Sequence, residues 1–137
     1  MITGVSGVTV IVRDQGEALR FYTEKLGFQT KTDMLMGEQG PRWVSVIART
    51  GNGPELILFN PSSFLSPEAA EEMLGLIGKM PGNVLTTDDC RATVAELAAK
   101  GVKILREPED YPYGVEAVFA DLYGNAFVLV QMNAAAQ

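Results

Sequence analysis

The sequence predicts an α+β protein that contains two βαβββ modules. The first observation is an internal repeat, because residues 8–28 and residues 82–102 both follow the order strand, helix, strand. Aligned at an offset of 74, the two stretches share an aspartate, an alanine and a glycine: Asp14 with Asp88, Ala18 with Ala92, and Gly27 with Gly101. The second observation is that apolar residues alternate with polar ones in short segments, and Gly- and Pro-rich turns separate these segments.

The first module is expected to begin with a strand near residues 8–12, where valines alternate with other residues. Asp14 is the expected N-cap of the following helix, with Glu17 as its capping-box partner. Gly27 is expected to end this helix. Three strands then complete the module, at residues 28–36, 42–48 and 55–59. We assign residues 1–60 to this module.

Residues 61–81 are an insertion in which Ser66 and Pro67 mark the start of a helix. The second module, residues 82–132, begins with a strand at 83–87, and Asp88 or Asp89 caps the helix that follows. Strands are expected at residues 102–106, 115–121 and 126–132, with a polar, aromatic hairpin at 107–114. Residues 133–137 are expected to be a frayed tail. The whole chain is expected to be one structural domain.

The composition favours a folded protein and disfavours nucleic-acid binding. Apolar residues make up 47% of the 137 residues and charged residues 20%, which suits a compact core. The formal net charge is −6 and no basic cluster interrupts the sequence, so a phosphate backbone would be repelled. The negative net charge would favour binding of a cationic small molecule. Solubility alone could equally explain this charge.

The chain contains one cysteine, Cys90, and no histidine. A single cysteine allows no internal disulfide and no cysteine-rich zinc site, in agreement with a reducing cytoplasm. Cys90 begins a predicted helix, where the helix dipole would favour a thiolate, although a small buried residue is the commoner role. The N-terminal residues lack the features of a secretory signal, and no apolar run reaches the roughly 18 residues of a membrane span. A cytoplasmic protein is therefore expected.

Two stretches resemble the vicinal-oxygen-chelate superfamily, which includes glyoxalases, bleomycin-resistance proteins and extradiol dioxygenases. They are VTVIVRDQGEALRFYTEKLGF near the N-terminus and GVEAVFADLYGNAFVLVQ near the C-terminus, where Leu122 and Tyr123 depart from the usual turn motif. The resemblance covers residues 2–132 and is weakest over the insertion. It implies that the two βαβββ modules form a curved, open-barrel-like mixed sheet around a cavity. It also implies a homodimer.

The resemblance further implies four metal-ligand positions, two in each module. They fall on Gly7 and Glu55 in the first module, and on Gly82 (or Pro81) and Val128 in the second. Only Glu55 offers a side-chain donor, whereas a divalent ion needs several N or O donors. We therefore expect no metal site and no cofactor.

A cavity without metal would be a mainly apolar site with a few polar groups. The residues expected to bind a ligand are two methionines, a tryptophan, a glutamate and two tyrosines: Met34, Met36, Trp43, Glu55, Tyr111 and Tyr113. Each has a structural alternative, since the tryptophan and methionines could pack in the core and the tyrosines could stiffen the hairpin.

Glu55 and Glu116 are the candidate catalytic residues. If buried, either carboxyl would have a raised pKa unless it is paired with a cation such as Arg42, and it could then act as a general acid or base. The remaining aspartates at strand and helix ends are expected to be caps and turn formers.

Four functions follow from these residues. The preferred one is a metal-independent protein that binds or sequesters a small molecule and is not an enzyme. The alternatives are a metal-independent lyase or isomerase that uses glutamate acid–base chemistry, a divalent-metal glyoxalase or dioxygenase with unusual donors, and an interaction domain whose cavity is filled by its own side chains. Neither nucleic acid nor a membrane is an expected partner.

Overall fold

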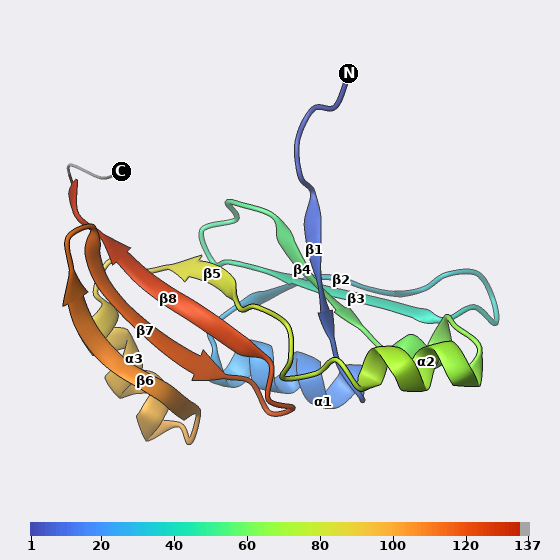
Figure 1. Cartoon of the computed structure of the whole chain (residues 1–137). Helices are drawn as coiled ribbons and strands as arrows, with labels where there is room; N and C mark the ends of the chain where they lie inside the picture. The colour runs from blue at the N-terminus through green and yellow to red at the C-terminus, as the bar shows by residue number, and fades with distance from the viewer. Residues whose placement is uncertain (135–137) are drawn as a thin grey trace. The chain divides into compact units, whose positions relative to one another are not determined.

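The computed structural model describes residues 1–134 and confirms an α+β fold of two βαβββ modules. The chain forms two compact units, Met1–Ile77 and a second unit that begins at Gly78. Each unit contains one four-stranded mixed sheet (Figure 1). The internal repeat in the sequence therefore corresponds to a repeated arrangement of strands.

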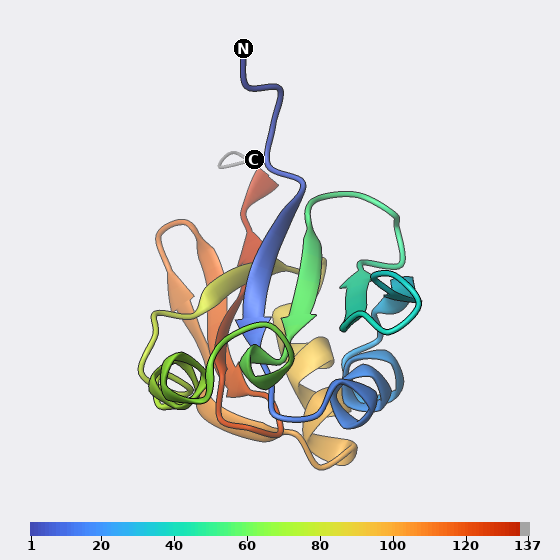
Figure 2. The ribbon, with the colours of Figure 1, turned by 90° about the vertical axis from the view of Figure 1, so that its right-hand side faces the viewer.

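The sheet of the first unit has the strand order β1-β4-β3-β2. Its strands are β1 (Gly7–Ile11), β2 (Gln29–Leu35), β3 (Arg42–Ile47) and β4 (Glu55–Phe59). Strands β1 and β4 pair in parallel and lie side by side (Figure 2), while the other neighbours are antiparallel. Helix α1 (Gln15–Arg20) continues into a π-helical turn, η1 (Phe21–Lys25), and packs against β3 and β4.

The start and end of the first helix are those that the sequence predicts. The Asp14 carboxylate accepts a hydrogen bond from the Glu17 N–H at 2.8 Å, which satisfies one of the free amides at the helix N-terminus. Gly27 follows the helix with φ at +81°, a conformation that favours glycine. The π-helical turn was not predicted, because one extra residue in a turn leaves no clear signal in the apolar pattern.

The insertion contributes a short 3₁₀ helix, η2 (Pro61–Ser63), and helix α2 (Pro67–Leu74) to the first unit. Ser66 caps α2, since its hydroxyl accepts from the Ala69 N–H at 3.3 Å, and Pro67 occupies the first helical position. The predicted helix start is confirmed.

The sheet of the second unit has the order β5-β8-β7-β6 (Figure 1). Its strands are β5 (Asn83–Thr86), β6 (Lys103–Tyr111), β7 (Gly114–Ala120) and β8 (Ala126–Met132), and helix α3 (Cys90–Ala99) packs against β6, β7 and β8. Asp89 caps α3 through the Ala92 N–H at 3.0 Å. Of the two aspartates left open by the sequence, Asp89 is therefore the cap.

The hairpin predicted at residues 107–114 is present, but the strand that enters it is longer than the predicted 102–106. β6 continues to Tyr111, and the turn is limited to Pro112 and Tyr113. Asn133 is tied to this turn, since its backbone N–H donates to the Tyr113 carbonyl at 2.8 Å and its side chain to the Pro112 carbonyl at 2.9 Å. Residues 135–137 of the expected tail lie outside the described residues.

Each unit has a core between its sheet and its helix. In the first unit it includes Val10, Ala18, Tyr22, Val44, Val46, Leu56 and Leu58, and in the second Cys90, Val94, Leu97, Phe119, Phe127 and Leu129. In the part of the chain that the structure describes, no helix has both the length and the apolar character needed to cross a membrane.

Candidate functional site

One face of the first unit's sheet packs against helix α1, and the other face lies on the opposite side. Ser45 pairs with Ile57 in the β3–β4 register, and side chains alternate along each strand. This places Trp43 on the same face as Ser45. Six side chains on β3 and β4 therefore share this face, which we call the distal face: Trp43, Ser45, Ile47, Glu55, Ile57 and Phe59.

An aromatic cluster covers one end of the distal face. The Phe64 ring stacks on Phe59 with centroids 4.8 Å apart and meets the Trp43 ring edge-on at 6.2 Å. Trp43 and Phe59 are half-buried, so neither ring is sealed in the core. The sequence did not single out Phe64, because it lies in the insertion just after η2 and has no local pattern that links it to the sheet.

Glu55 lies at the opposite end of β4 from Phe59. The Ser45 hydroxyl donates to Glu55 Oε1 at 2.5 Å; Ser45 is fully buried and Glu55 is half-buried. Within residues 1–134, no protein group donates a hydrogen bond to the other carboxylate oxygen, Oε2. Gly7 is the register partner of Glu55 on β1 and adds no side chain beside it.

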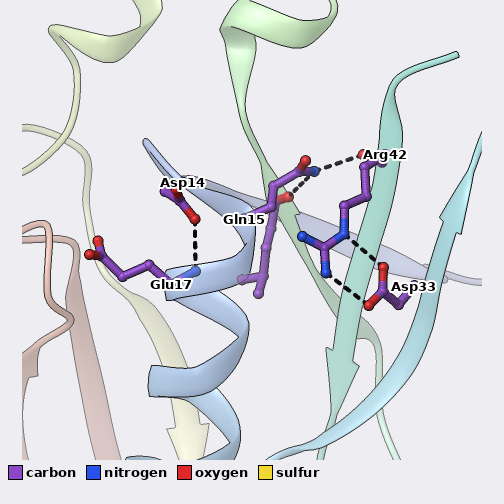
Figure 3. A network of polar contacts seen from close by, with 6 residues as sticks. Asp14, Gln15, Glu17, Asp33 and Arg42 are labelled. Carbon is purple, nitrogen blue, oxygen red and sulfur yellow. Dashed lines mark hydrogen bonds and ion pairs between the residues drawn. The ribbon is translucent and has the colours of Figure 1, made fainter. Parts of the chain in front are cut away.

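Arg42, which the sequence offered as an example of a cation that could pair with Glu55 or Glu116, pairs with neither. Its guanidinium forms a two-point ion pair with Asp33, at 2.8 Å from Nε to Oδ1 and 2.9 Å from Nη2 to Oδ2 (Figure 3). The reason is the alternation along β3. Arg42 precedes Trp43 and therefore points to the side of the sheet on which α1 lies, away from Glu55.

The two methionines differ in position. Met34 is the register partner of Trp43 on β2, and it is 59% exposed. Met36 lies beyond the end of β2 in the β2–β3 turn, where its N–H donates to the Pro41 carbonyl at 2.8 Å. Only Met34 therefore lies beside the aromatic cluster in the strand register.

The second unit brings together five polar and aromatic residues at its β6–β7 hairpin, which we call the hairpin cluster: Arg106, Glu109, Tyr111, Tyr113 and Glu116. Both oxygens of the Glu116 carboxylate are occupied, one by Arg106 at 2.5 Å and the other by the Tyr113 hydroxyl at 2.8 Å. The Tyr111 hydroxyl donates to Glu109 at 2.9 Å.

The tyrosines of the hairpin cluster form a parallel stack. Their ring centroids are 5.5 Å apart with an angle of 9° between the planes, and the Arg106 guanidinium lies 5.9 Å from the Tyr111 centroid. The hydrogen bond to Glu116 raises the pKa of Tyr113, and the one to Glu109 raises the pKa of Tyr111, because ionisation would place two negative charges together. The cluster is thus internally satisfied and holds the two rings in fixed positions.

The residues at the family's metal positions do not fit a metal ion. Gly7, opposite Glu55, has no side-chain donor, and Val128 pairs with Val84. A Cβ at Gly82 would lie 2.8 Å from the Ala126 carbonyl oxygen, so a ligating side chain could not be added there without a backbone shift. Among residues 1–134, no group of three or more His, Cys, Asp or Glu side chains could hold a metal ion.

Cys90 and the turn-forming aspartates have structural roles. Cys90 is fully buried, its thiol donates to the Leu129 carbonyl at 3.7 Å, and burial raises its pKa, so the alternative of a dipole-favoured thiolate was wrong. The buried Asp121 carboxylate accepts from the N–H groups of Tyr123 and Asn125, both at 2.9 Å. This confirms the prediction that Asp121 is a turn former.

Comparison with known proteins gives a consistent picture. A family model described as the glyoxalase/bleomycin resistance protein/dioxygenase superfamily matches residues 4–129. An uncharacterized protein of Shewanella frigidimarina is 36% identical over 126 residues, which span 92% of this chain and 91% of that protein. The uncharacterized protein YurT of Bacillus subtilis is 32% identical over 90% of this chain and 94% of its own length.

Solved structures share both the fold and substantial sequence identity. The crystal structure of UcmS2 matches with a TM-score of 0.83 and 38% identity, covering 96% of this chain and 99% of that one. The crystal structure of TnmS3, described as an antibiotic binding protein from Streptomyces sp. CB03234, matches with a TM-score of 0.75 and 30% identity, covering 96% and 98% of the two chains.

Proposed function

Because this chain belongs to the glyoxalase/bleomycin resistance protein/dioxygenase superfamily, we propose that it binds and sequesters a small organic molecule without a metal ion. The observation that carries the proposal is the composition of the distal face. Trp43, Phe59 and Phe64 offer ring surface, and Glu55 offers a carboxylate oxygen that accepts from no donor among residues 1–134. Small-molecule sites commonly combine apolar and aromatic side chains with a few polar groups.

The similarity to TnmS3 supports an antibiotic-like ligand. That protein is described as binding an antibiotic, and it resembles this chain over nearly the full length of both. The misfit between the metal-ligand positions and any metal site supports binding over the metal-dependent chemistry of the superfamily.

Trp43 provides a direct probe of binding, because it is the only tryptophan in the sequence. We expect at least one member of a panel of glycopeptide and aromatic antibiotics to change Trp43 fluorescence in a saturable way. Phe59→Ala should weaken this binding at least fivefold. Phe21→Ala is the matched control, since Phe21 lies in η1 and not on the distal face. No saturable change across a broad panel, confirmed by calorimetry, would contradict the proposal.

A metal-independent lyase or isomerase is the second candidate, and the free Glu55 Oε2 is the observation that favours it. Glu116 is less suited to acid–base chemistry, because Arg106 and Tyr113 occupy both of its oxygens. The two functions differ in what happens to the ligand. Mass spectrometry of ligand recovered from the complex should show an unchanged mass for a binding protein and a changed mass or isomer ratio for an enzyme.

We further propose that the protein is a homodimer. Several large apolar side chains are well exposed in the single chain, including Met34 at 59% and Val84 at 64%, and a second copy would shield some of them. Light scattering coupled to gel filtration should give twice the 14.8 kDa mass of one chain. A mass equal to that of one chain at micromolar concentration would contradict the dimer.

A further inference from the structure

We propose that Glu55 binds the protonated amine of the ligand, and that this ligand also carries a planar ring, which contacts the aromatic cluster. The inference rests on the proposed binding function and names the ligand class: an aromatic compound with a basic amine on a flexible arm. Glu55 would thus take a new role at a position where the family resemblance implies a metal ligand.

The first support is the way in which Glu55 is held. Ser45 is fully buried, and its only described side-chain hydrogen bond is the one to Glu55 Oε1 at 2.5 Å. This bond fixes one carboxylate oxygen and leaves the other available to a donor. A carboxylate held in this way is ready to receive a charged N–H group, which forms stronger hydrogen bonds than a neutral donor does.

The second support is that no cation among residues 1–134 forms an ion pair with Glu55. The ion pairs among residues 1–134 join Arg42 to Asp33, Arg91 to Asp110 and Arg106 to Glu116. Arg42, the cation that precedes Trp43 on β3, points to the other side of the sheet. A half-buried carboxylate without a cation favours a positively charged ligand, and the net charge of −6 acts in the same direction.

The third support is that β1 offers no polar group beside the carboxylate. Glu55 and Gly7 are register partners on β4 and β1, so the strand next to Glu55 presents no side chain at that point. The Ile57 side chain packs over Gly7, since a Cβ at Gly7 would lie 2.9 Å from Ile57 Cδ1. The neighbour of Glu55 on this side is therefore apolar and cannot satisfy the carboxylate.

The strand geometry gives the length of the ligand. Glu55 and Phe59 are four residues apart on β4 and share one face, which corresponds to about 13 Å along the strand. Because the side chains can lean toward each other, an amine separated from a ring system by about eight bonds fits this spacing. Dansylcadaverine, a naphthalene sulfonamide with a five-carbon aminoalkyl arm, is a suitable fluorescent probe. Its N-acetyl derivative has the same ring and arm but no charge.

The test compares the two probes by fluorescence titration of the full-length protein and three variants. We expect dansylcadaverine to bind the unmodified protein at least tenfold more tightly than N-acetyl-dansylcadaverine. Glu55→Gln should remove this preference. Glu24→Gln changes the net charge by the same amount on an exposed residue of η1 and should retain it. Ser45→Ala should reduce the preference only in part, with circular dichroism as the check that each variant is folded.

Equal affinity for the two probes, or a preference that survives Glu55→Gln, would overturn the inference while leaving binding itself intact. If neither probe binds but a neutral antibiotic from the panel does, the amine claim fails and the proposed function stands. If neither the probes nor any member of the panel binds, both the inference and the proposed function fail.

Discussion

The exposed ion pair between Asp33 and Arg42 shows how a single residue responds to pH. The Arg42 hydrogen bonds lower the pKa of Asp33, so the pair contributes stability above the ordinary carboxyl value of 3.8 and loses it as pH falls through the lowered pKa. Both side chains are more than one-third exposed, which limits the contribution. Asp33→Asn should lower the free energy of unfolding at neutral pH by about 0.2–1 kcal/mol.

Urea unfolding of the unmodified protein and of Asp33→Asn, repeated at decreasing pH, measures this effect. The two stabilities should converge below pH 3.8, because protonated Asp33 no longer pairs with Arg42. A difference that stays constant into that range would show that the ion pair is not its source.

The buried thiol of Cys90 should be unreactive in the folded protein. Burial disfavours the thiolate, which is the form that attacks disulfide reagents, and the side chain has no exposed surface. We expect negligible reaction with Ellman's reagent in native buffer and complete reaction of one thiol per chain in denaturant. Rapid labelling in native buffer would contradict the burial of this residue.

At the scale of elements, Gln15 connects helix α1 to the ends of two strands. Its side-chain amide donates to the carbonyl oxygens of Arg42 at 2.8 Å and Leu58 at 3.1 Å (Figure 3). The β3–β4 pairing covers only Ser45 with Ile57 and Val46 with Leu56, so Gln15 bridges the strands where they no longer pair with each other. These ends carry Trp43 and Phe59 of the distal face.

Replacing Gln15 by leucine should therefore destabilise the first unit. The variant leaves the Arg42 and Leu58 carbonyls without this donor, and a buried unsatisfied group costs about 1–3 kcal/mol. Urea unfolding should show a loss in this range, together with a shift of the Trp43 emission maximum. Gln29→Leu is the matched control, because Gln29 is exposed on β2 and should change stability little. Equal effects of the two substitutions would refute the bridging role.

In the hairpin between β6 and β7, the carboxylates that the two tyrosines contact should set the tyrosine pKa values. Because its pKa is raised, Tyr113 favours folding fully below its ordinary pKa of 10, and this contribution is lost as pH rises through the raised value. Glu116→Gln should bring the Tyr113 pKa back toward 10, as measured by tyrosinate absorbance. Tyr113→Phe identifies the absorbance change that belongs to Tyr113. Glu109→Gln should instead lower the pKa of Tyr111. An unchanged titration in Glu116→Gln would contradict the Tyr113–Glu116 hydrogen bond.

Elements with a strong local pattern could be predicted from the sequence, and long-range pairings could not. The strands at residues 55–59 and 126–132 have the predicted bounds, because each is a short, largely apolar run that directly follows turn residues. The extension of β6 was missed because its polar residues are paired with residues of β7, far from them in sequence. The ion pair of Arg42 and the ring contacts of Phe64 were missed for the same reason. Their partners depend on strand register and on the course of the insertion.

At the scale of the whole molecule, the repeated βαβββ unit is retained while the two copies differ in chemistry. The sheet of the first unit presents an aromatic face with one uncompensated carboxylate, and the sheet of the second unit carries a hairpin cluster whose charges are internally paired. Family membership could be predicted because the stretches at residues 8–28 and 114–131 resemble the superfamily and the chain contains an internal repeat. The ligand could not be predicted, because it depends on which side chains lie together on one face of a sheet.

A calorimetric titration before and after chelator treatment tests the central claim of metal-independent binding most directly. The titrant is the antibiotic that gives the largest Trp43 fluorescence change. We predict saturable binding with the same dissociation constant in untreated protein, in protein dialysed against EDTA, and after zinc, nickel, manganese or iron is restored. Binding that disappears with the chelator and returns with one of these metals would contradict the claim.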